Sequence, residues 1–219
     1  MDAEATPSAS GYFGHPRPEM LPLVPAGAAR ILEVGCGAGA FARLVKEVRR
    51  CEYWGVEPSP AAWAGARKVV DRLIEGAFDP AALRGETFDC IVFNDVLEHL
   101  PDPDRALSEA RTLLRPGGHV VASIPNLRYF PYLYRLAWLG ELEYEDAGVL
   151  DRTHLRLFTP RSVRNLFLRN GFGIRTMRGI NSFLTRGESL SLLALNLLTL
   201  GRLRDARYSQ VAVDAEKLG

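Results

Sequence analysis

The sequence has almost no net charge and no long apolar run. In 219 residues, Lys and Arg number 27 and Asp and Glu number 26, so the formal net charge is +1. A chain without a strong basic field is poorly equipped to attract a polyanion, and we expect no nucleic-acid partner. The longest apolar-biased run, Leu190–Leu200, includes Ser, Asn and Thr and falls far short of the roughly 20 residues of a membrane-spanning helix.

Cysteine is also scarce. The three cysteines, Cys36, Cys51 and Cys90, are odd in number, widely spaced and without a C-x-x-C motif. This pattern argues against a disulfide framework and a zinc knuckle and favours a reducing compartment. The first residues, Met1–Gly14, lack the basic and apolar regions of a signal peptide. We therefore expect a cytoplasmic protein with a frayed tail at Met1–Ser10.

What is present is the composition and rhythm of one α/β domain. Apolar residues make up 47% of the chain and charged residues 24%, as in ordinary globular proteins. Expected strands alternate with expected helices, which predicts a doubly wound, mostly parallel sheet that binds its ligand beyond the carboxyl ends of the strands. The expected strands are Arg30–Val34, Tyr53–Val56, Arg72–Ile74, Phe88–Phe93 and His119–Ile124; the expected helices are Ala40–Arg50, Pro60–Val70 and Asp104–Leu114, with a turn at Pro116–Gly118.

The rhythm changes in the second half. Residues 125–160 are rich in Tyr, Phe and Trp and are too long for a simple connection, so we expect an insertion that acts as a lid or substrate module. A helix, a strand, an apolar helix and a last strand are expected after it, over Arg161–Asn170, Phe172–Ile180, part of Phe183–Leu203 and Tyr208–Ala215. The division is thus a tail and cap segment over residues 1–29, with a short helix at Pro18–Val24, and one domain over residues 30–219.

A glycine cluster follows the first expected strand. Gly35-Cys36-Gly37-Ala38-Gly39 stands between strand and helix, where glycines allow a tight turn and a close approach to a ligand. Glu57 ends the second strand, 22 residues after Gly35, where a carboxylate can accept hydrogen bonds from a ribose diol. Both NAD and S-adenosylmethionine carry such a diol, and the loop alone admits either.

The neighbouring segments narrow the choice. ILEVGCGAGAF, VEPS, FDCIVFNDVLEHLPDP and LRPGGHVVASIPN, in this order, resemble the class I S-adenosylmethionine-dependent methyltransferases over Arg30–Asn126. Dehydrogenases do not normally carry D-x-L-E-H or L-x-P-G-G at these places. The resemblance implies a Rossmann-like, seven-stranded sheet whose last strand runs antiparallel between the fifth and sixth. It also implies S-adenosylmethionine as cofactor and S-adenosylhomocysteine as product.

The resemblance implies roles for single residues. The acid at Glu33 would hold the methionyl end of the cofactor and Glu57 the ribose, while Asn94 and Asp95 would face the sulfonium. The remaining members of the expected cofactor-binding set are the loop residues Gly35, Cys36, Gly37 and Gly39, the ribose-side Pro58, the adenine-side Gly76, Ala77 and Phe78 with Asp79 as a stand-in acid, and Arg17 toward the cofactor's carboxylate.

Flanking segments resemble narrower groups. Tyr12, Arg17–Met20 and the run DRTHLRLFTPRSVRNLFLRNGF are similar to bacterial methyltransferases associated with polysaccharide and glycan biosynthesis, and more distantly to ubiquinone-pathway O-methyltransferases. The resemblance implies O-methylation of a sugar or glycan hydroxyl. The alternatives are a small hydroxylated metabolite, such as a quinone precursor or natural product, and a non-catalytic cofactor-binding regulator.

The catalytic candidates are His99, His154 and Asp95. Asp95, Glu98 and His99 would share one face if residues 95–100 formed a helical turn, and His154 from the insertion could close over them. Three interpretations stay open. Either histidine could be a general base; the four residues could bind a divalent metal, since their spacing resembles the E-x-x-E-H…H site of small-RNA 2′-O-methyltransferases; or Glu98 and His99 could only stabilise the turn. We assign no metal ligand at this stage.

Partners are less constrained. We expect a small-molecule or glycan acceptor and a monomer or homodimer. The apolar run Leu190–Leu200, beside Arg202, Arg204 and Arg207, would permit peripheral contact with a membrane surface.

Overall fold

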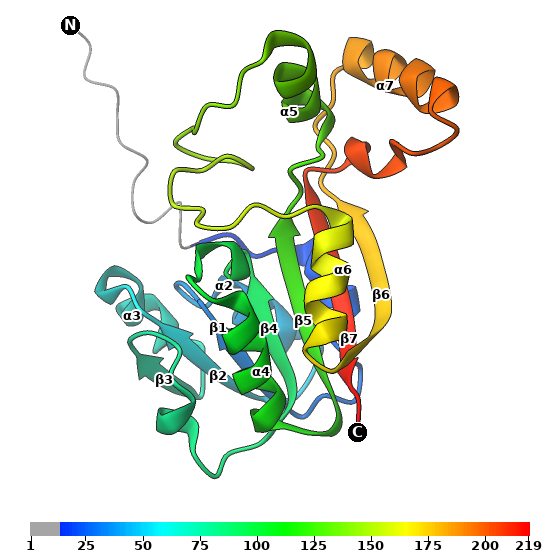
Figure 1. The fold of residues 1–219 in the computed structure, drawn as a ribbon. Helices are drawn as coiled ribbons and strands as arrows, with labels where there is room; N and C mark the ends of the chain where they lie inside the picture. Colours follow the sequence, from blue (N-terminus) through cyan, green and yellow to red (C-terminus); the bar gives the residue numbers. More distant parts are fainter. Residues whose placement is uncertain (1–13) are drawn as a thin grey trace, which may run out of the picture.

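The protein is described by a computed structural model that covers residues 14–219. The predicted tail at Met1–Ser10 and Tyr12 lie outside the described residues. The chain forms one seven-stranded sheet in the order β3-β2-β1-β4-β5-β7-β6 (Figure 1). Its strands are β1 Arg30–Val34, β2 Glu52–Glu57, β3 Arg72–Glu75, β4 Phe88–Asn94, β5 Leu114–Pro125, β6 Phe172–Ile180 and β7 Gln210–Lys217.

The strand directions confirm the predicted fold class. β3, β2, β1, β4 and β5 pair in parallel, whereas β7 is antiparallel to both β5 and β6. β4 reads as a continuous apolar run because helices cover both of its faces, and all but two of its residues are buried. The order reverses between β1 and β4, and this is the point where open α/β sheets bind their ligands.

Helices cover the two faces. They are α2 Ala40–Val48, α3 Pro60–Ala66, α4 Pro103–Leu113 and α6 Pro160–Arg169, with short 3-10 turns at η1 Pro18–Leu23, η2 Pro80–Leu83 and η3 Leu97–His99. Each of α4 and α6 begins at a side-chain cap: Asp102 accepts a hydrogen bond from the amide of Arg105, and Thr159 forms a capping box with Ser162.

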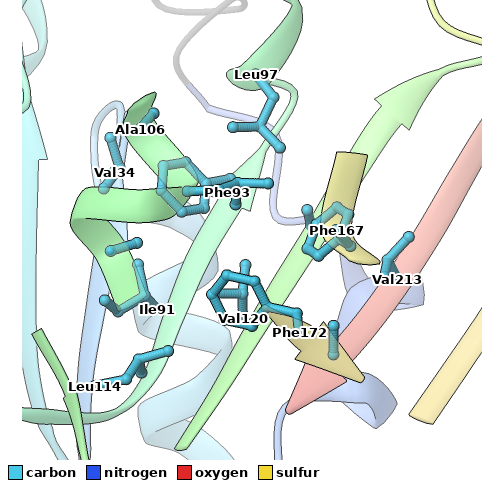
Figure 2. Close-up of a cluster of buried hydrophobic side chains, with 14 of the residues drawn as sticks. Val34, Ile91, Phe93, Leu97, Ala106, Leu114, Val120, Phe167, Phe172 and Val213 are labelled. Carbon is cyan, nitrogen blue, oxygen red and sulfur yellow. The ribbon is translucent and has the colours of Figure 1, made fainter. Parts of the chain in front are cut away.

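The core has one apolar layer on each face of the sheet. The first packs α4 and α6 on β4, β5 and β7, with Phe93, Phe167 and Phe172 fully buried (Figure 2). The second packs α2 and η1 on the other face and includes Ile31, Phe41 and Met20. Met20 is fully buried, so the short helix predicted at Pro18–Val24, observed as η1, is packed onto the same core as the sheet.

Two local predictions are wrong. The turn expected at Pro116–Gly118 is a bulge within β5, which follows α4 directly; Gly117 has φ +72°, and the register slips between Phe88 and Cys90 of β4. The helical turn expected over residues 95–100 is shorter. Asp95 has φ +53° and lies outside it, and only Leu97–His99 form a 3-10 turn.

The aromatic insertion stands above the carboxyl end of β5 (Figure 1). It begins with α5, Phe130–Tyr134, which continues into a π-helical turn, η4 Arg135–Leu139. Tyr129 and Phe130 are buried, whereas Tyr134 and Trp138 are exposed and stack with ring centroids 6.4 Å apart. Some of the aromatics therefore form the insertion's own core, and others present open ring faces.

The predicted apolar helix is α7, Arg186–Leu198, followed by the turn η5 Arg204–Arg207. Among its leucines only Leu192 is buried, in a small cluster with Phe130 and Ala206, while Leu190, Leu193 and Leu197 are exposed. None of the helices formed by residues 14–219 has the length and apolarity needed to cross a membrane.

Candidate active site

The predicted site residues converge on the carboxyl ends of β1, β2 and β4. β1 pairs with β2 on one side and with β4 on the other. The glycine loop follows β1, Glu57 ends β2 and Asn94 ends β4. Because parallel strands end at one edge of the sheet, these groups surround a single place at the switch point.

The glycine loop has a conformation that only glycine adopts without strain. Gly35, Gly37 and Gly39 have φ values of +73°, +54° and +82°. A Cβ atom on Gly35 would lie 2.6 Å from a methyl group of Val96, so the turn after β4 also requires a glycine there. Gly39 is the N-cap residue of α2 and carries no capping side chain, so the first amides of the helix stay open at the loop.

Glu57 ties the loop to β2. Its carboxylate is 4% exposed and accepts hydrogen bonds from the amides of Gly37 at 2.7 Å and Ser59 at 2.8 Å. Each carboxylate oxygen keeps acceptor capacity for a further donor. The Glu57 carbonyl accepts a hydrogen bond from the amide of Gly76 at 2.9 Å, so the end of β3 is fixed to the same residue. Pro58 follows on the exposed surface.

Glu33 is a buried acid with neutral partners. Its two oxygens accept hydrogen bonds from the hydroxyl of Tyr53 at 3.0 Å and the side-chain amide of Asn94 at 3.1 Å. Burial raises the pKa of this carboxyl to about 8, against smaller opposing effects from those two hydrogen bonds. The Asn94 side-chain oxygen is itself buried and has no hydrogen-bond partner among the described residues.

The part of the site that follows β3 is more exposed to solvent. Gly76 has φ +125°, Ala77 is exposed, and Phe78 packs edge-on against Phe93 with ring centroids 6.1 Å apart. Asp79, the predicted stand-in acid on the adenine side, has a structural role at the start of η2. Its carboxylate accepts a hydrogen bond from the Ala81 amide at 2.9 Å and caps η2.

Cys36 faces the sheet. Its sulfur would lie 2.5 Å from a Cβ atom on Gly55, so the side chain fills the space that this β2 glycine leaves. Burial raises the pKa of the thiol, which keeps it protonated and unreactive. The amide of Cys36 donates a hydrogen bond to the Val56 carbonyl. At this position the loop therefore offers the cofactor site its backbone and not the thiol.

Asp95 is not part of the group formed by Glu98, His99 and His154, and it lies in a polar cluster with Arg17. Arg17 pairs with Asp95 and donates a hydrogen bond to the hydroxyl of Ser123 at 2.7 Å. Ser123 and the side-chain amide of Gln210 donate to the Asp95 carboxylate at 2.8 and 2.9 Å. Arg17 and Asp95 both belong to the predicted cofactor-binding set, and here their opposite charges pair with each other.

Glu98, His99 and His154 come together. One ligand atom from each lies within 4.8 Å of the others, and the two imidazole rings have centroids 4.8 Å apart. The Glu98 carboxyl is 1% exposed, and neither of its oxygens has a hydrogen-bond partner in the part of the chain that the structure describes. Burial raises the pKa of Glu98 and lowers that of His99. Three of the four residues predicted as one group are thus adjacent, without Asp95.

Sequence reasoning missed three supporting residues. Ser123 pairs with Asn94 in the β4–β5 register, and Gln210 pairs with Pro125 across β5 and β7. The predicted position of the last strand beside the fifth was the signal that could have placed Gln210 near Asp95. Tyr53, inside β2, is paired with Ile31, two residues before Glu33 on β1, and its hydroxyl reaches diagonally across the paired strands to the Glu33 carboxylate.

Known proteins resemble this chain in sequence and in fold. A family model described as a methyltransferase domain matches residues 10–176. The chain is 33% identical over 114 residues to a ubiquinone biosynthesis O-methyltransferase of Alkalilimnicola ehrlichii, covering 49% of this chain and 46% of that protein. A protein of the same name from Xanthomonas axonopodis is 33% identical over 127 residues, covering 54% and 51%. The chain spans about half the length of these curated relatives.

Solved structures share the fold. An S-adenosylmethionine-dependent methyltransferase from Mesorhizobium loti superposes with a TM-score of 0.60 at 20% identity, covering 96% of this chain and 99% of the other. At this identity the similarity establishes the arrangement of strands and helices, and the site residues must supply the rest of the argument.

Proposed function

The chain belongs to the class I S-adenosylmethionine-dependent methyltransferases, and from this premise we propose that it O-methylates a small hydroxylated metabolite. The support for that acceptor class is the set of relatives named for ubiquinone biosynthesis, which the chain matches over about half of their length. They favour a small hydroxylated acceptor of the quinone-precursor kind over the sugar or glycan hydroxyl that the sequence first suggested.

The residues present fit S-adenosylmethionine. The buried side-chain oxygen of Asn94 has no partner within residues 14–219, and Glu57 keeps free acceptor capacity, so the cradle offers acceptors to hydroxyl and ammonium donors. The loop glycines leave backbone where a Cβ atom would otherwise stand. We assign Glu57 to the ribose diol, Glu33 and Asn94 to the methionyl end, and Phe78 with Gly76 and Ala77 to the adenine.

When bound, S-adenosylmethionine supplies a methyl group on a sulfonium, which is already a good leaving group. The chain's own task is therefore to align an acceptor oxygen with that methyl group and to remove the oxygen's proton. The Arg17–Asp95–Ser123 cluster at the end of β4 is held from three sides, so we assign Asp95 a role in fixing the cradle wall near the sulfonium.

His99 and His154 are the two imidazole groups of the site that could accept a proton. The Nδ1 atom of His154 lies 2.9 Å from the Val149 carbonyl, and that of His99 lies 3.1 Å from the Thr153 carbonyl. A carbonyl only accepts hydrogen bonds, so in the neutral form of each ring Nδ1 carries the proton and Nε2 presents a lone pair. Either Nε2 can serve as general base, or both can act as ligands.

The observation that carries the proposal is the hydrogen bond from the Gly37 amide to the buried Glu57 carboxylate. It places the ribose-binding acid and the glycine loop in one cradle at the switch point. A glycan acceptor is the second candidate, favoured by the exposed ring faces of Tyr134 and Trp138, since sugar rings stack on aromatic faces.

The test is methyl transfer from labelled S-adenosylmethionine into fractionated extract of the organism that makes the protein. We expect label in small extractable metabolites. Label confined to the polysaccharide or lipid-linked fraction would support the glycan candidate instead. Binding of S-adenosylmethionine without S-adenosylhomocysteine formation in any fraction would indicate a regulator and contradict both candidates.

A further inference from the structure

In the cluster of Glu98, His99 and His154, the buried carboxyl group of Glu98 lacks a hydrogen-bond partner. Glu98 is a carboxyl group taken out of water, with neither oxygen hydrogen-bonded by any of residues 14–219. Native proteins seldom bury an acid without a partner, because the desolvation cost is left uncompensated. The atoms that face it are the rings of His99 and His154, whose protons point away toward backbone carbonyls.

The two imidazoles are oriented as metal ligands are. In each, Nδ1 donates to a main-chain carbonyl, of Thr153 for His99 and of Val149 for His154. A hydrogen bond of this kind fixes the tautomer, aims Nε2 at the ion and raises its basicity. Each ring therefore keeps Nε2 for a metal ion, and one ligand atom from each histidine and one from the carboxylate lie within 4.8 Å of one another.

The backbone holds these ligands in place. The Glu98 carbonyl accepts hydrogen bonds from the amides of Leu155 at 2.8 Å and Arg156 at 3.0 Å, so the segment that carries His154 is fastened to the turn that carries Glu98 and His99. Metal–ligand bonds of about 2.0–2.2 Å imply ligand separations of roughly 3–4 Å, so a small contraction would complete the site.

The other acids near this cluster already accept hydrogen bonds from other residues. The Asp95 carboxylate is occupied by Arg17, Ser123 and Gln210. The Asp151 carboxylate accepts hydrogen bonds from the amide and hydroxyl of Thr153. The cluster thus offers three protein ligands and leaves coordination positions open, as in sites that bind a substrate through the metal.

We propose that Glu98, His99 and His154 bind one divalent transition-metal ion, whose open positions hold two adjacent oxygens of the acceptor, as in a catechol. Two imidazoles and one carboxylate favour Mn²⁺, Fe²⁺, Co²⁺ or Zn²⁺ over Mg²⁺. Val96, two residues before Glu98, packs on Gly35, so the site borders the cofactor cradle. This inference rests on the proposed O-methyltransferase function and narrows its substrate to acceptors with neighbouring oxygens.

The reaction then balances without a further reagent. When an acceptor hydroxyl coordinates the ion, it loses its proton to water, because a divalent metal lowers the pKa of an oxygen ligand. A lone pair of that oxygen forms the new bond to the methyl carbon as the carbon–sulfur bond breaks. The electron pair of the broken bond stays on sulfur, and the sulfonium becomes the neutral thioether of S-adenosylhomocysteine.

The first experiment titrates the metal-stripped full chain with Co²⁺ and follows its visible absorption. We expect one equivalent to bind, and Glu98→Gln and His99→Ala each to weaken binding at least tenfold. His119→Asn is the matched control, because His119 also lies beside a carboxylate, Asp214 at 2.6 Å, but in a pair without a third ligand. Wild-type binding below one equivalent, or equal affinity in Glu98→Gln, would overturn the site.

Folding of the variants is checked separately. Circular dichroism and thermal unfolding without metal should show Glu98→Gln folded, because glutamine has nearly the same shape. His99 is only half-buried, so His99→Ala gives a second test if Glu98→Gln does not fold. A folded His99→Ala chain that binds Co²⁺ as tightly as wild type would also overturn the site.

The second experiment adds catechol or phenol to the Co²⁺-loaded chain. Catechol, with two adjacent oxygens, should change the cobalt spectrum at a concentration at least tenfold lower than phenol. No change with catechol would show that the ion plays a purely structural part and would overturn the acceptor inference.

S-adenosylhomocysteine formation, measured with and without EDTA, separates this inference from the function beneath it. Loss of activity with EDTA and its recovery with Mn²⁺ or Co²⁺ is the expected result. Methyl transfer that is indifferent to EDTA would overturn the metal role and leave the proposed function standing. Tight Co²⁺ and catechol binding without S-adenosylhomocysteine formation would keep the site and contradict the function.

Discussion

The substitution Glu33→Gln should have opposite effects on the stability of the cofactor-free chain and on its affinity for the cofactor. The carboxyl is buried, 2% exposed, and its described partners, Tyr53 and Asn94, are neutral. In the cofactor-free protein an ionised Glu33 is unfavourable, whereas the bound cofactor would bring a positive ammonium group to it. Glutamine keeps the shape and can accept from Asn94, and the Tyr53 hydroxyl can rotate to accept from its amide.

The size and direction of the effect follow from the pKa. Burial raises the Glu33 pKa from an ordinary 4.5 to about 8 in the folded chain. The folded state therefore holds this proton more tightly than the unfolded state, so the contribution to stability is full below pH 4.5 and falls as pH rises toward 8. The loss is about 1.4 kcal/mol per pH unit, or roughly 4 kcal/mol between pH 5 and 8. The glutamine side chain of the Glu33→Gln variant does not titrate, so the variant does not lose this stability as the pH rises.

Urea unfolding of the cofactor-free chain at pH 5, 6, 7 and 8 measures this. The free energy of unfolding of Glu33→Gln minus that of wild type should increase steadily across the series. Glu47→Gln, on the exposed face of α2, is the control and should show no such trend. The affinity for S-adenosylmethionine should fall in the variant, because Glu33→Gln removes a charged partner worth about 1.5–3 kcal/mol, which raises the dissociation constant roughly 10- to 150-fold. A pH-independent difference in stability would refute the reasoning.

Three further predictions follow from the site. Glu57→Ala should weaken S-adenosylmethionine binding by about 1–3 kcal/mol in calorimetry, and unchanged affinity would remove Glu57 from the ribose site. Gly35→Ala should lower the free energy of unfolding by about 2 kcal/mol or more, from its positive φ and its contact with Val96, and adding Val96→Ala should restore only the contact part. In the native protein a thiol reagent should label Cys51 alone, because the other two cysteines are buried; labelling of two or three thiols before unfolding would contradict this.

The sequence predicted the sheet well because its inner strands carry a strong signal. β1 and β4 are short apolar runs buried on both faces, and each is bounded by glycine, proline or charge. The sequence could not show that β5 would start at Leu114. A bulge that lets the chain pass from helix to strand without a turn is a property of the pairing with β4, not of residues 116–118 alone.

The candidate site was predictable where it lies on strand ends and unpredictable where distant segments meet. The loop glycines, Glu33 and Glu57 sit where motif spacing indicated. Asp95 was expected to share a helical turn with His99, but its backbone is left-handed and its carboxylate pairs with Arg17, 78 residues earlier in the chain. Such a competing partner has no local signature. The prediction of a glycan acceptor rested on the segments that flank the cofactor-binding half, and the names of the curated relatives favour a smaller acceptor instead.

The most direct measurement is the product formed by the purified chain from S-adenosylmethionine carrying a ¹³C-labelled methyl group. Acceptors would be catechol, phenol and a simple sugar, with the product identified by NMR and S-adenosylhomocysteine counted in parallel. We expect a ¹³C-methoxy signal on catechol, equal in amount to the S-adenosylhomocysteine released. A methoxy signal on the sugar alone, or a labelled methyl group on nitrogen, carbon or sulfur when extract is supplied, would contradict the proposed function.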